Sequence, residues 1–229
     1  MVKRKTNPNE ELVVTEKDFI STKKDEINRI IGSKIILEGK TESQKELLRL
    51  IKENNIIICS GISGSGKTYV AIAEALRLIK DKRNSYKNIY LLKSVTSLKG
   101  EDIGYIKGDI KEKMEPFMWS YFINFQKVIG DKYKKLMDNN VIIPFPLAFI
   151  RGMSVDNSII ILDETQNIDL VNLKTVLTRI STSSKLIVLG DVNQVDLKKR
   201  EESSLDKALE ILKDVPGLGT LYMNDEDEN

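Results

Sequence analysis

The chain has 229 residues, of which 41% are hydrophobic and 31% are charged, and its formal net charge is only +2. This length and composition fit one globular domain with a sizeable core, and they exclude the strongly basic character typical of duplex-binding proteins. The sequence has no histidine and a single cysteine, Cys59. It therefore excludes histidine acid–base chemistry, an internal disulfide framework and a cysteine-based zinc site, and it suits a reducing compartment.

The two ends of the chain carry opposite charges. Residues 1–10 include Lys3-Arg4-Lys5 and are predicted to form a disordered basic tail, whereas residues 224–229 form an acidic tail. Residues 11–223 are predicted to form a single domain. The first residues lack the apolar stretch of a signal peptide, and no apolar run has the length of a membrane span, so we expect a cytoplasmic protein with no membrane partner.

The first predicted elements lead to a glycine-rich loop. A polar helix is expected over Glu16–Ile31, and the capping-box spacing of Thr41-Glu42-Ser43-Gln44 opens a second helix. An apolar strand follows over residues 55–60, and a helix over residues 67–81. The order strand, glycine loop, helix is the context that a phosphate-binding loop requires.

The loop between this strand and helix has the full G-x-x-x-x-G-K-T pattern. Its backbone N–H groups and the helix N-terminus are expected to hold a polyphosphate. Lys67 would contact the β- and γ-phosphates, and Thr68 would bind Mg²⁺. The predicted nucleotide-binding residues are Gly61, Ile62, Ser63, Gly64, Ser65, Gly66, Lys67, Thr68 and Tyr69. The alternative, a glycine turn whose lysine lies in solvent, fits the flanking pattern poorly.

The middle of the chain contains a strand over residues 88–93, a long functional loop or broken helix over residues 94–113, and a helix from Pro116 to about Ile129. Apolar residues recur every three or four positions in this helix, which indicates core cover or a subunit contact rather than a base-stacking platform. A short strand over residues 141–143 is predicted to end at Pro144 and Pro146.

The remaining elements alternate between strand and helix. Strands are predicted over residues 158–162, 185–189 and 220–222, and helices over residues 170–180 and 203–213. The strand over residues 158–162 is apolar throughout, as expected when both faces are buried. The sequence therefore predicts an α/β fold with a parallel sheet flanked by helices on both faces.

Two polar groups follow strands of this sheet. Asp163 and Glu164 come directly after an apolar strand, at the sheet edge where α/β proteins bind ligands. Asp163 is expected to hold Mg²⁺ beside Thr68, and Glu164 to orient or deprotonate the attacking water. The alternative is a strand that ends in two solvated acids.

The second group is Gly190-Asp191-Val192-Asn193-Gln194. Asp191 and Gln194 are expected to face the same crevice, with Gln194 bonding the γ-phosphate or the water. Taken alone, this segment also fits an ordinary polar turn. Gln166 and Gln44 are weaker candidates: Gln44 could contact the adenine edge, although a capping-box glutamine already has a structural role.

Together these segments resemble the PhoH family of P-loop ATPases, which is related to the first motor domain of superfamily 1 helicases. The resemblance covers Thr41 to Met223 and is closest to the short, phage-type members. Its most specific parts are Leu98–Asp109 and Pro146–Gly152, which accompany the phosphate loop, Leu162–Asn167 and Gly190–Gln194. It implies a RecA-like core, binding and hydrolysis of ATP, a link to RNA metabolism and a tendency to form rings.

The chain departs from the family in three places. Lys93-Ser94 stands where many members carry an Arg-Pro pair, an arginine-bearing segment is missing near the end, and no PIN nuclease domain is present. These departures make helicase or nuclease activity less secure than ATPase activity.

Assembly is expected because the chain has one motor domain, and the transition state of γ-phosphate transfer gains from an arginine that a neighbour can supply. A homo-oligomer, possibly a hexameric ring, is therefore predicted, with Arg151, Arg179 and Arg200 as candidates. Single-stranded RNA or DNA is the expected partner. A nucleotide-gated protein-interaction module with slow hydrolysis is the main alternative, and a P-loop kinase is disfavoured by Glu164.

Overall fold

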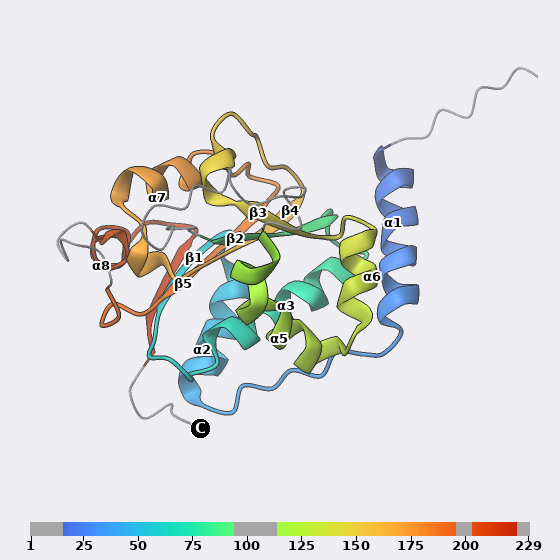
Figure 1. Cartoon of the computed structure of the whole chain (residues 1–229), viewed down its shortest axis with the longest axis horizontal. Helices are drawn as coiled ribbons and strands as arrows, with labels where there is room; N and C mark the ends of the chain where they lie inside the picture. The colour runs from blue at the N-terminus through green and yellow to red at the C-terminus, as the bar shows by residue number, and fades with distance from the viewer. Residues whose placement is uncertain (1–15, 94–113, 196–202, 224–229) are drawn as a thin grey trace, which may run out of the picture.

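The computed structural model describes residues 16–93, 114–195 and 203–223, apart from the side chains of residues 16–19. The two predicted tails, the predicted loop over residues 94–113 and Arg200 lie outside the described residues. Elements formed by the described residues are shown in Figure 1.

Within the described residues, six strands form one parallel sheet in the order β3-β2-β4-β5-β1-β6. Their bounds are β1 Ile56–Ser60, β2 Asn88–Lys93, β3 Ile142–Pro146, β4 Ser158–Asp163, β5 Lys185–Gly190 and β6 Leu218–Tyr222. The helices are α1 Glu16–Ile31, α2 Glu42–Glu53, α3 Lys67–Lys80, α5 Trp119–Ile129, α6 Lys132–Asp138, α7 Leu170–Leu177 and α8 Ser204–Ile211. The predicted α/β fold with a parallel sheet is confirmed.

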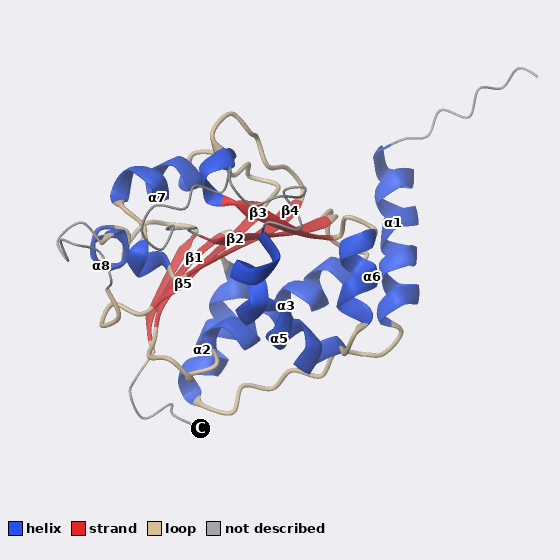
Figure 2. Cartoon of the chain, in the orientation of Figure 1, coloured by secondary structure: helices blue, strands red, loops and turns tan. Residues whose placement is uncertain are grey.

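Helices cover both faces of the sheet (Figure 2). Alternate residues of each central strand point to opposite faces, so Ile57 and Cys59 pack with α1, α2, α3, α5 and α6, whereas Ile58 packs with α7 and α8. Strands β4 and β5 are buried at every position, because they have neighbouring strands on both sides and helices on both faces.

The strand order determines which loops meet. Strand β5 lies between β1 and β4, and all three run in the same direction. Their carboxyl ends therefore bring Gly61, Glu164 and Asp191 to one edge of the sheet, although the first two are far apart in sequence.

The prediction that Pro144 and Pro146 end the strand was wrong, because both lie within β3. Among the strands that the structure describes, β3 lies at the edge of the sheet and pairs only with β2. The carbonyl of Val141 accepts a hydrogen bond from Ile89 of β2, so every second residue after Val141 faces β2. The prolines occupy the intervening positions, where the missing N–H would point away from the sheet.

The aromatic helix is core cover, as its spacing predicts. It begins with a 3₁₀ turn at Glu115–Met118 that contains Pro116, and it continues as α5. Tyr121 and Phe125 are fully buried, and the Tyr121 hydroxyl donates to the Leu92 and Ile161 carbonyls at 2.9 and 3.2 Å. The short helix α6 was not predicted, because its sequence buries only Tyr133 and Leu136.

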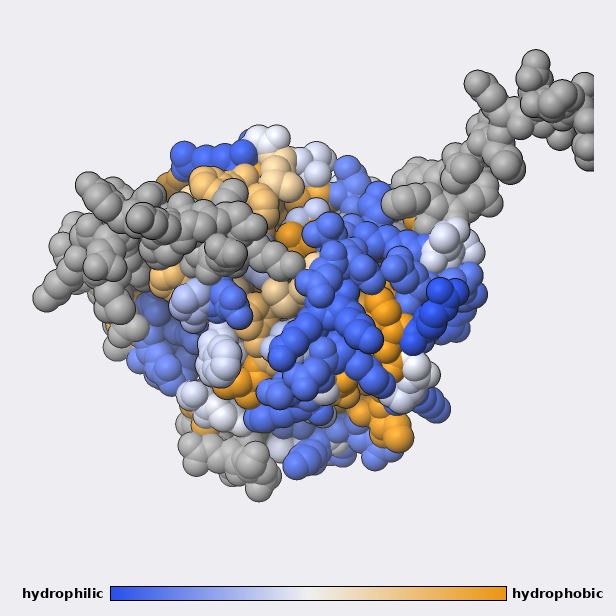
Figure 3. Space-filling view, turned by 45° about the vertical axis from the view of Figure 1, so that its right-hand side comes forward, coloured by the Kyte–Doolittle hydropathy of each residue, from blue (hydrophilic) through white to orange (hydrophobic). Residues whose placement is uncertain are grey.

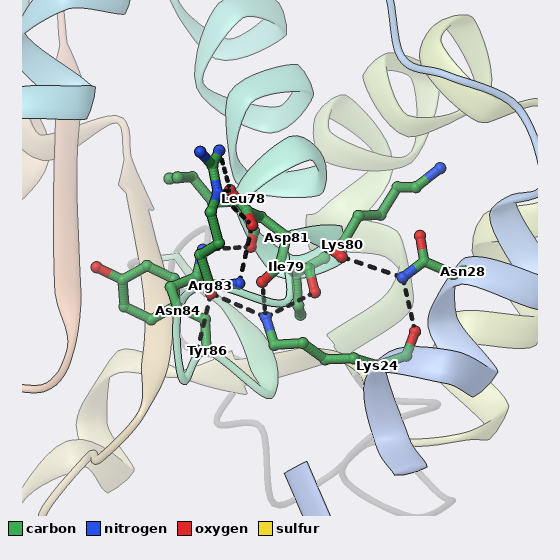
Figure 4. A network of polar contacts seen from close by, with 9 residues as sticks. All are labelled: Lys24, Asn28, Leu78, Ile79, Lys80, Asp81, Arg83, Asn84 and Tyr86. Carbon is green, nitrogen blue, oxygen red and sulfur yellow. Dashed lines mark hydrogen bonds and ion pairs between the residues drawn. The ribbon is translucent and has the colours of Figure 1, made fainter. Parts of the chain in front are cut away.

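The buried side chain of Lys24 on α1 forms hydrogen bonds with the carboxyl end of α3 and the residues that follow it (Figure 4). The Lys24 ammonium donates to the Ile79 carbonyl at 3.1 Å, the Asp81 carbonyl at 2.6 Å and the Asn84 side chain at 2.8 Å. Burial lowers the pKa of Lys24 to about 8, so the charged form with three donors persists at pH 7. The positive charge also suits a helix carboxyl end.

Lys24→Met is expected to lower the free energy of unfolding by about 2 kcal/mol, because it leaves buried carbonyls without their donor. Urea denaturation monitored by circular dichroism measures the loss. Lys82→Met is the matched control, because Lys82 pairs with Asp25 across the same interface but is 60% exposed; a change of about 0.5 kcal/mol or less is expected. Equal losses in the two variants would contradict a special role for Lys24.

The face of the molecule shown in Figure 3 combines hydrophilic side chains with hydrophobic areas. Within residues 16–93, 114–195 and 203–223, no helix is long and apolar enough to cross a bilayer.

Cys59 is fully buried in β1, and burial raises the pKa of its thiol to about 12.

Candidate active site

The predicted phosphate loop connects β1 to α3. Gly64 and Gly66 have φ angles of 88° and 83°, a left-handed conformation that glycine adopts without a steric cost. Ser65 is fully buried, and its hydroxyl donates to the Ile62 carbonyl at 2.8 Å, which closes the loop. The Lys67 ammonium lies within this loop and donates to the same carbonyl at 3.0 Å.

Asp163, which the sequence predicts to lie beside this loop, contacts it in the structure. The Thr68 hydroxyl donates to an oxygen of Asp163 at 2.9 Å, across 95 residues of sequence. Burial raises the pKa of Asp163, as does the neighbouring Glu164, while the bond from Thr68 and the charge of Lys67 lower it. A buried carboxylate beside a hydroxyl is a set of hard oxygen donors that fits Mg²⁺, with phosphate oxygens and water completing its shell.

Glu164 lies at the end of β4 in a strained conformation. Its φ and ψ are 58° and 36°, in the left-handed region that glutamate rarely adopts and that costs about 1–3 kcal/mol. Its backbone N–H donates to Asp163 at 3.0 Å. Strained residues cluster at functional sites, and this one turns the chain immediately after the acid that faces Thr68.

A buried amide links this acid to the next strand. The Gln166 side chain donates to the Glu164 carboxylate at 2.7 Å and accepts from the Asp191 backbone N–H at 3.0 Å. Gln166 is only 1% exposed, and a Cβ on Gly190 would lie 2.6 Å from its side-chain oxygen. Gln166 therefore positions Glu164 relative to the end of β5, a stronger role than its sequence position alone indicated.

For the nucleotide hydrolysis that the sequence leads us to expect, Gln166→Leu should lower the turnover number by about tenfold and leave KM within twofold, because it removes the partner that orients Glu164 and no residue of the phosphate loop. Steady-state kinetics with varied nucleotide measure both constants. Gln166→Glu keeps the side-chain length and one acceptor but removes the donor to Glu164, so it should not restore turnover. A rise in KM at constant turnover in Gln166→Leu would contradict the positioning role.

These groups border one cavity of about 560 Å³, a size typical of ligand sites. Lys67, Thr68, Asp163 and Glu164 are among the residues that line it. The rest is lined by the segment between α1 and α2, by the first turn of α3 and by α5, through Ile36, Leu37, Glu38, Lys40, Gln44, Ser63, Gly64, Gly66, Tyr69, Val70, Ser120, Asn124 and Lys127.

Some residues that the sequence predicts for the site do not line this cavity. Gln194 is exposed and does not line the cavity. The Asp191 side chain is buried and accepts from the Asn193 backbone at 2.9 Å, which stabilises the local turn. Arg151 and Arg179 are exposed, and neither lines the cavity. The structure thus brings together Thr68, Asp163 and Glu164, but not Gln194.

Gln44 does line the cavity, but its amide is engaged. It donates to the Ser65 carbonyl at 3.0 Å and accepts from the Lys40 backbone N–H at 2.9 Å. The Gln44 backbone N–H in turn donates to the N-cap Thr41 at 3.2 Å. Gln44 therefore supports the phosphate loop from α2.

Known proteins resemble this chain over most of its length. The family model described as PhoH-like protein matches residues 36–228. The chain is 35% identical over 210 residues to a PhoH-like protein of Bacillus subtilis, covering 91% of this chain and 65% of that protein. It is 29% identical over 192 residues to Protein PhoH of Escherichia coli K12, covering 82% and 53%. The chain thus spans about half to two thirds of the length of the curated relatives it matches.

Among solved structures, the large terminase of a thermophilic bacteriophage aligns with a TM-score of 0.51 and 13% sequence identity, covering 82% of this chain and 46% of that one. At this identity the likeness supports the fold alone. The family match, the parallel sheet and the phosphate loop agree on a RecA-like P-loop NTPase fold. The chain belongs to the PhoH-like protein family.

Proposed function

We propose that this protein is a Mg²⁺-dependent ATPase. The observation that carries the proposal is the contact between Thr68 and Asp163, because it joins a complete phosphate loop to a buried acid at the end of a second strand. A nucleotide phosphate chain bound in this cavity beside the loop would lie near Lys67, Asp163 and Glu164, which all line it.

Each residue has a distinct role in this proposal. The loop amides and Lys67 hold the phosphates, for which Lys67 exchanges its bond to the Ile62 carbonyl for phosphate oxygens. Thr68 and Asp163 would hold Mg²⁺, which would supply positive charge to the phosphate chain. Glu164 orients the attacking water and accepts its proton, and Gln166 fixes the carboxylate of Glu164.

We further propose that ATP hydrolysis is coupled to single-stranded RNA or DNA and that the protein assembles with copies of itself. The resemblance described above supports this coupling. Arg151 and Arg179 are exposed, as an arginine supplied to a neighbour must be. Gln194 remains a proposed sensor residue, reaching the nucleotide only if the β5 turn moves.

A second candidate function is a nucleotide-gated interaction module with slow hydrolysis. It is favoured by Trp119 and Ile123, which lie one turn apart on α5 and are 63% and 39% exposed. Large exposed apolar side chains at helical spacing are typical of a docking surface.

ATP turnover measured with Mg²⁺ or EDTA, and with or without single-stranded RNA and DNA, tests the proposal. Turnover that needs Mg²⁺ and rises several-fold with one nucleic acid is expected, and it should weaken with salt as phosphate contacts do. Mass in solution with and without nucleotide tests assembly. Tight ATP binding with negligible turnover under every condition would instead favour the interaction module.

A further inference from the structure

Strand β6 ends beside the phosphate loop. It runs parallel to β1, and Tyr222 at its end pairs with Ser60, the last residue of β1. Met223 follows, and its backbone N–H donates to the Ser60 carbonyl at 2.8 Å. The chain therefore leaves the sheet at the edge where the phosphate loop begins.

Met223 packs against the loop itself. Its side chain is 6% exposed. A Cβ on Gly61 would lie 3.0 Å from the Met223 Cβ and 3.0 Å from the Ser65 hydroxyl oxygen. Gly61, the first residue of the loop, is therefore in close contact with both, and Met223 holds the start of the following segment against the loop.

The residues after Met223 carry a dense negative charge. Asn224 is followed by four carboxylates in succession, at Asp225, Glu226, Asp227 and Glu228. Because an extended chain spans at most about 3.6 Å per residue, residues 224–228 reach up to about 18 Å from Met223. The Lys67 ammonium lies within this reach, because it bonds the carbonyl of Ile62, the residue after Gly61.

The loop can receive anions other than phosphate. The first bond within α3 runs from the Val70 N–H to the Gly66 carbonyl at 2.9 Å. The N–H groups of the three residues before Val70 therefore have no acceptor within the helix. Carboxylates bind such a helix N-terminus as phosphates do. The Lys67 ammonium adds a full positive charge, and its described partner, the Ile62 carbonyl, is neutral.

We propose that the acidic tail, residues 224–229, binds the phosphate loop in the absence of nucleotide and competes with the triphosphate for it. A tethered anion on a short flexible linker has an effective concentration of the order of millimolar, which makes this segment a strong competitor. The tail thereby raises the nucleotide concentration at which the site fills. This inference rests on the proposed function, because the loop must be the polyphosphate site.

The acids of the cavity explain how nucleotide displaces the tail. Asp163 and Glu164 line the same cavity as Lys67, and like charges repel, so both disfavour the carboxylates of the tail. A triphosphate that brings Mg²⁺ is attracted by these acids instead. The tail is therefore held by the loop N–H groups and Lys67 and yields to the metal-bound nucleotide.

Neutralising the tail tests the competition. The tail-neutral variant combines four substitutions in the full chain: Asp225→Asn, Glu226→Gln, Asp227→Asn and Glu228→Gln. Calorimetric titration uses two probes, tripolyphosphate and the Mg²⁺ complex of the β,γ-imido analogue of ATP. In about 0.05 M salt, the variant is expected to bind both probes about fivefold more tightly than the unmodified chain, because the tethered competitor is lost. In about 1 M salt, where the Debye length is about 3 Å, the two chains should agree within about twofold.

The matched control removes the same amount of charge from other places. It neutralises four exposed acids that do not line the cavity, namely Glu26, Asp131, Asp156 and Asp214. Its affinity for both probes should stay within about twofold of the unmodified chain, because solvent and salt screen distant exposed charges. Equal gains in the two variants would reduce the effect to net charge and overturn the inference.

Two further outcomes also overturn the inference and leave the proposed function intact. One is unchanged affinity in the tail-neutral variant. The other is weaker binding of the Mg²⁺ complex, which would assign the tail carboxylates to the metal. Failure of both probes to bind every variant would instead defeat the proposed function, and the inference with it.

Carbodiimide cross-linking of the full chain without nucleotide locates the tail. The reagent joins a carboxylate to an ammonium that touches it, so mass spectrometry is expected to find Lys67 linked to residues 225–228. Tripolyphosphate should suppress this product, because it occupies the loop. Cross-links confined to lysines that do not line the cavity would overturn the inference, even if the tail-neutral variant bound nucleotide more tightly.

Discussion

Glu164→Gln is expected to lower ATP turnover by about 10²–10⁴-fold while ATP still binds, because the amide cannot accept a proton from the attacking water. The substitution keeps the size of the side chain. Turnover is measured under saturating Mg·ATP, and binding is measured separately by calorimetry.

Glu115→Gln is the matched control, because Glu115 is exposed in the turn before α5 and is not among the residues that line the cavity. Its turnover should stay within twofold of the unmodified chain. Turnover in Glu164→Gln above about a tenth of the original would contradict the role of Glu164 as the base. In that case the water would be activated by another group or by the phosphate itself.

Lys67→Ala is expected to weaken ATP binding by about 100-fold and to reduce turnover by a further factor of about 10², because a charge-assisted contact to the β- and γ-phosphates is lost in both the ground and transition states. The fold should be retained, since the described contact of the ammonium is with the Ile62 carbonyl of its own loop. Calorimetry and steady-state turnover measure the two effects.

Lys135→Ala on α6 is the matched control for a lost exposed lysine, and it should leave affinity and turnover unchanged. A nucleotide-dependent rise in melting temperature gives a second measure, because a ligand that binds the folded chain stabilises it. Full stabilisation by ATP in Lys67→Ala would contradict the assignment of the loop as the phosphate site.

Much of the site could be predicted because its signals are local. The glycines at positions 64 and 66 adopt the left-handed angles that the motif demands. The uninterrupted apolar run of β4 indicated a strand buried on both faces, which placed Asp163 at the binding edge of the sheet. The contact with Thr68 then follows from the general geometry of parallel sheets.

The remaining features depend on pairing that the sequence does not encode locally. The double role of Gln166 requires β5 to lie directly beside β4, and strand order is not visible in a sequence of alternating elements. The same holds for β3, whose prolines are tolerated only because it is an edge strand. Gln194 differs from its prediction for a related reason. Its position after a strand predicted that it lines the cavity, but in the structure its side chain is exposed to solvent.

The burial of Cys59 makes its thiol a natural probe of the central strand. A reagent that needs an accessible thiolate cannot react while β1 remains in the sheet, because the sulfur has no exposed surface and a pKa of about 12. Alkylation then proceeds only through opening events that release this strand. The phosphate loop begins two residues later, at Gly61. The factor by which bound nucleotide lowers the alkylation rate therefore measures how much an occupied loop stabilises β1 within the sheet.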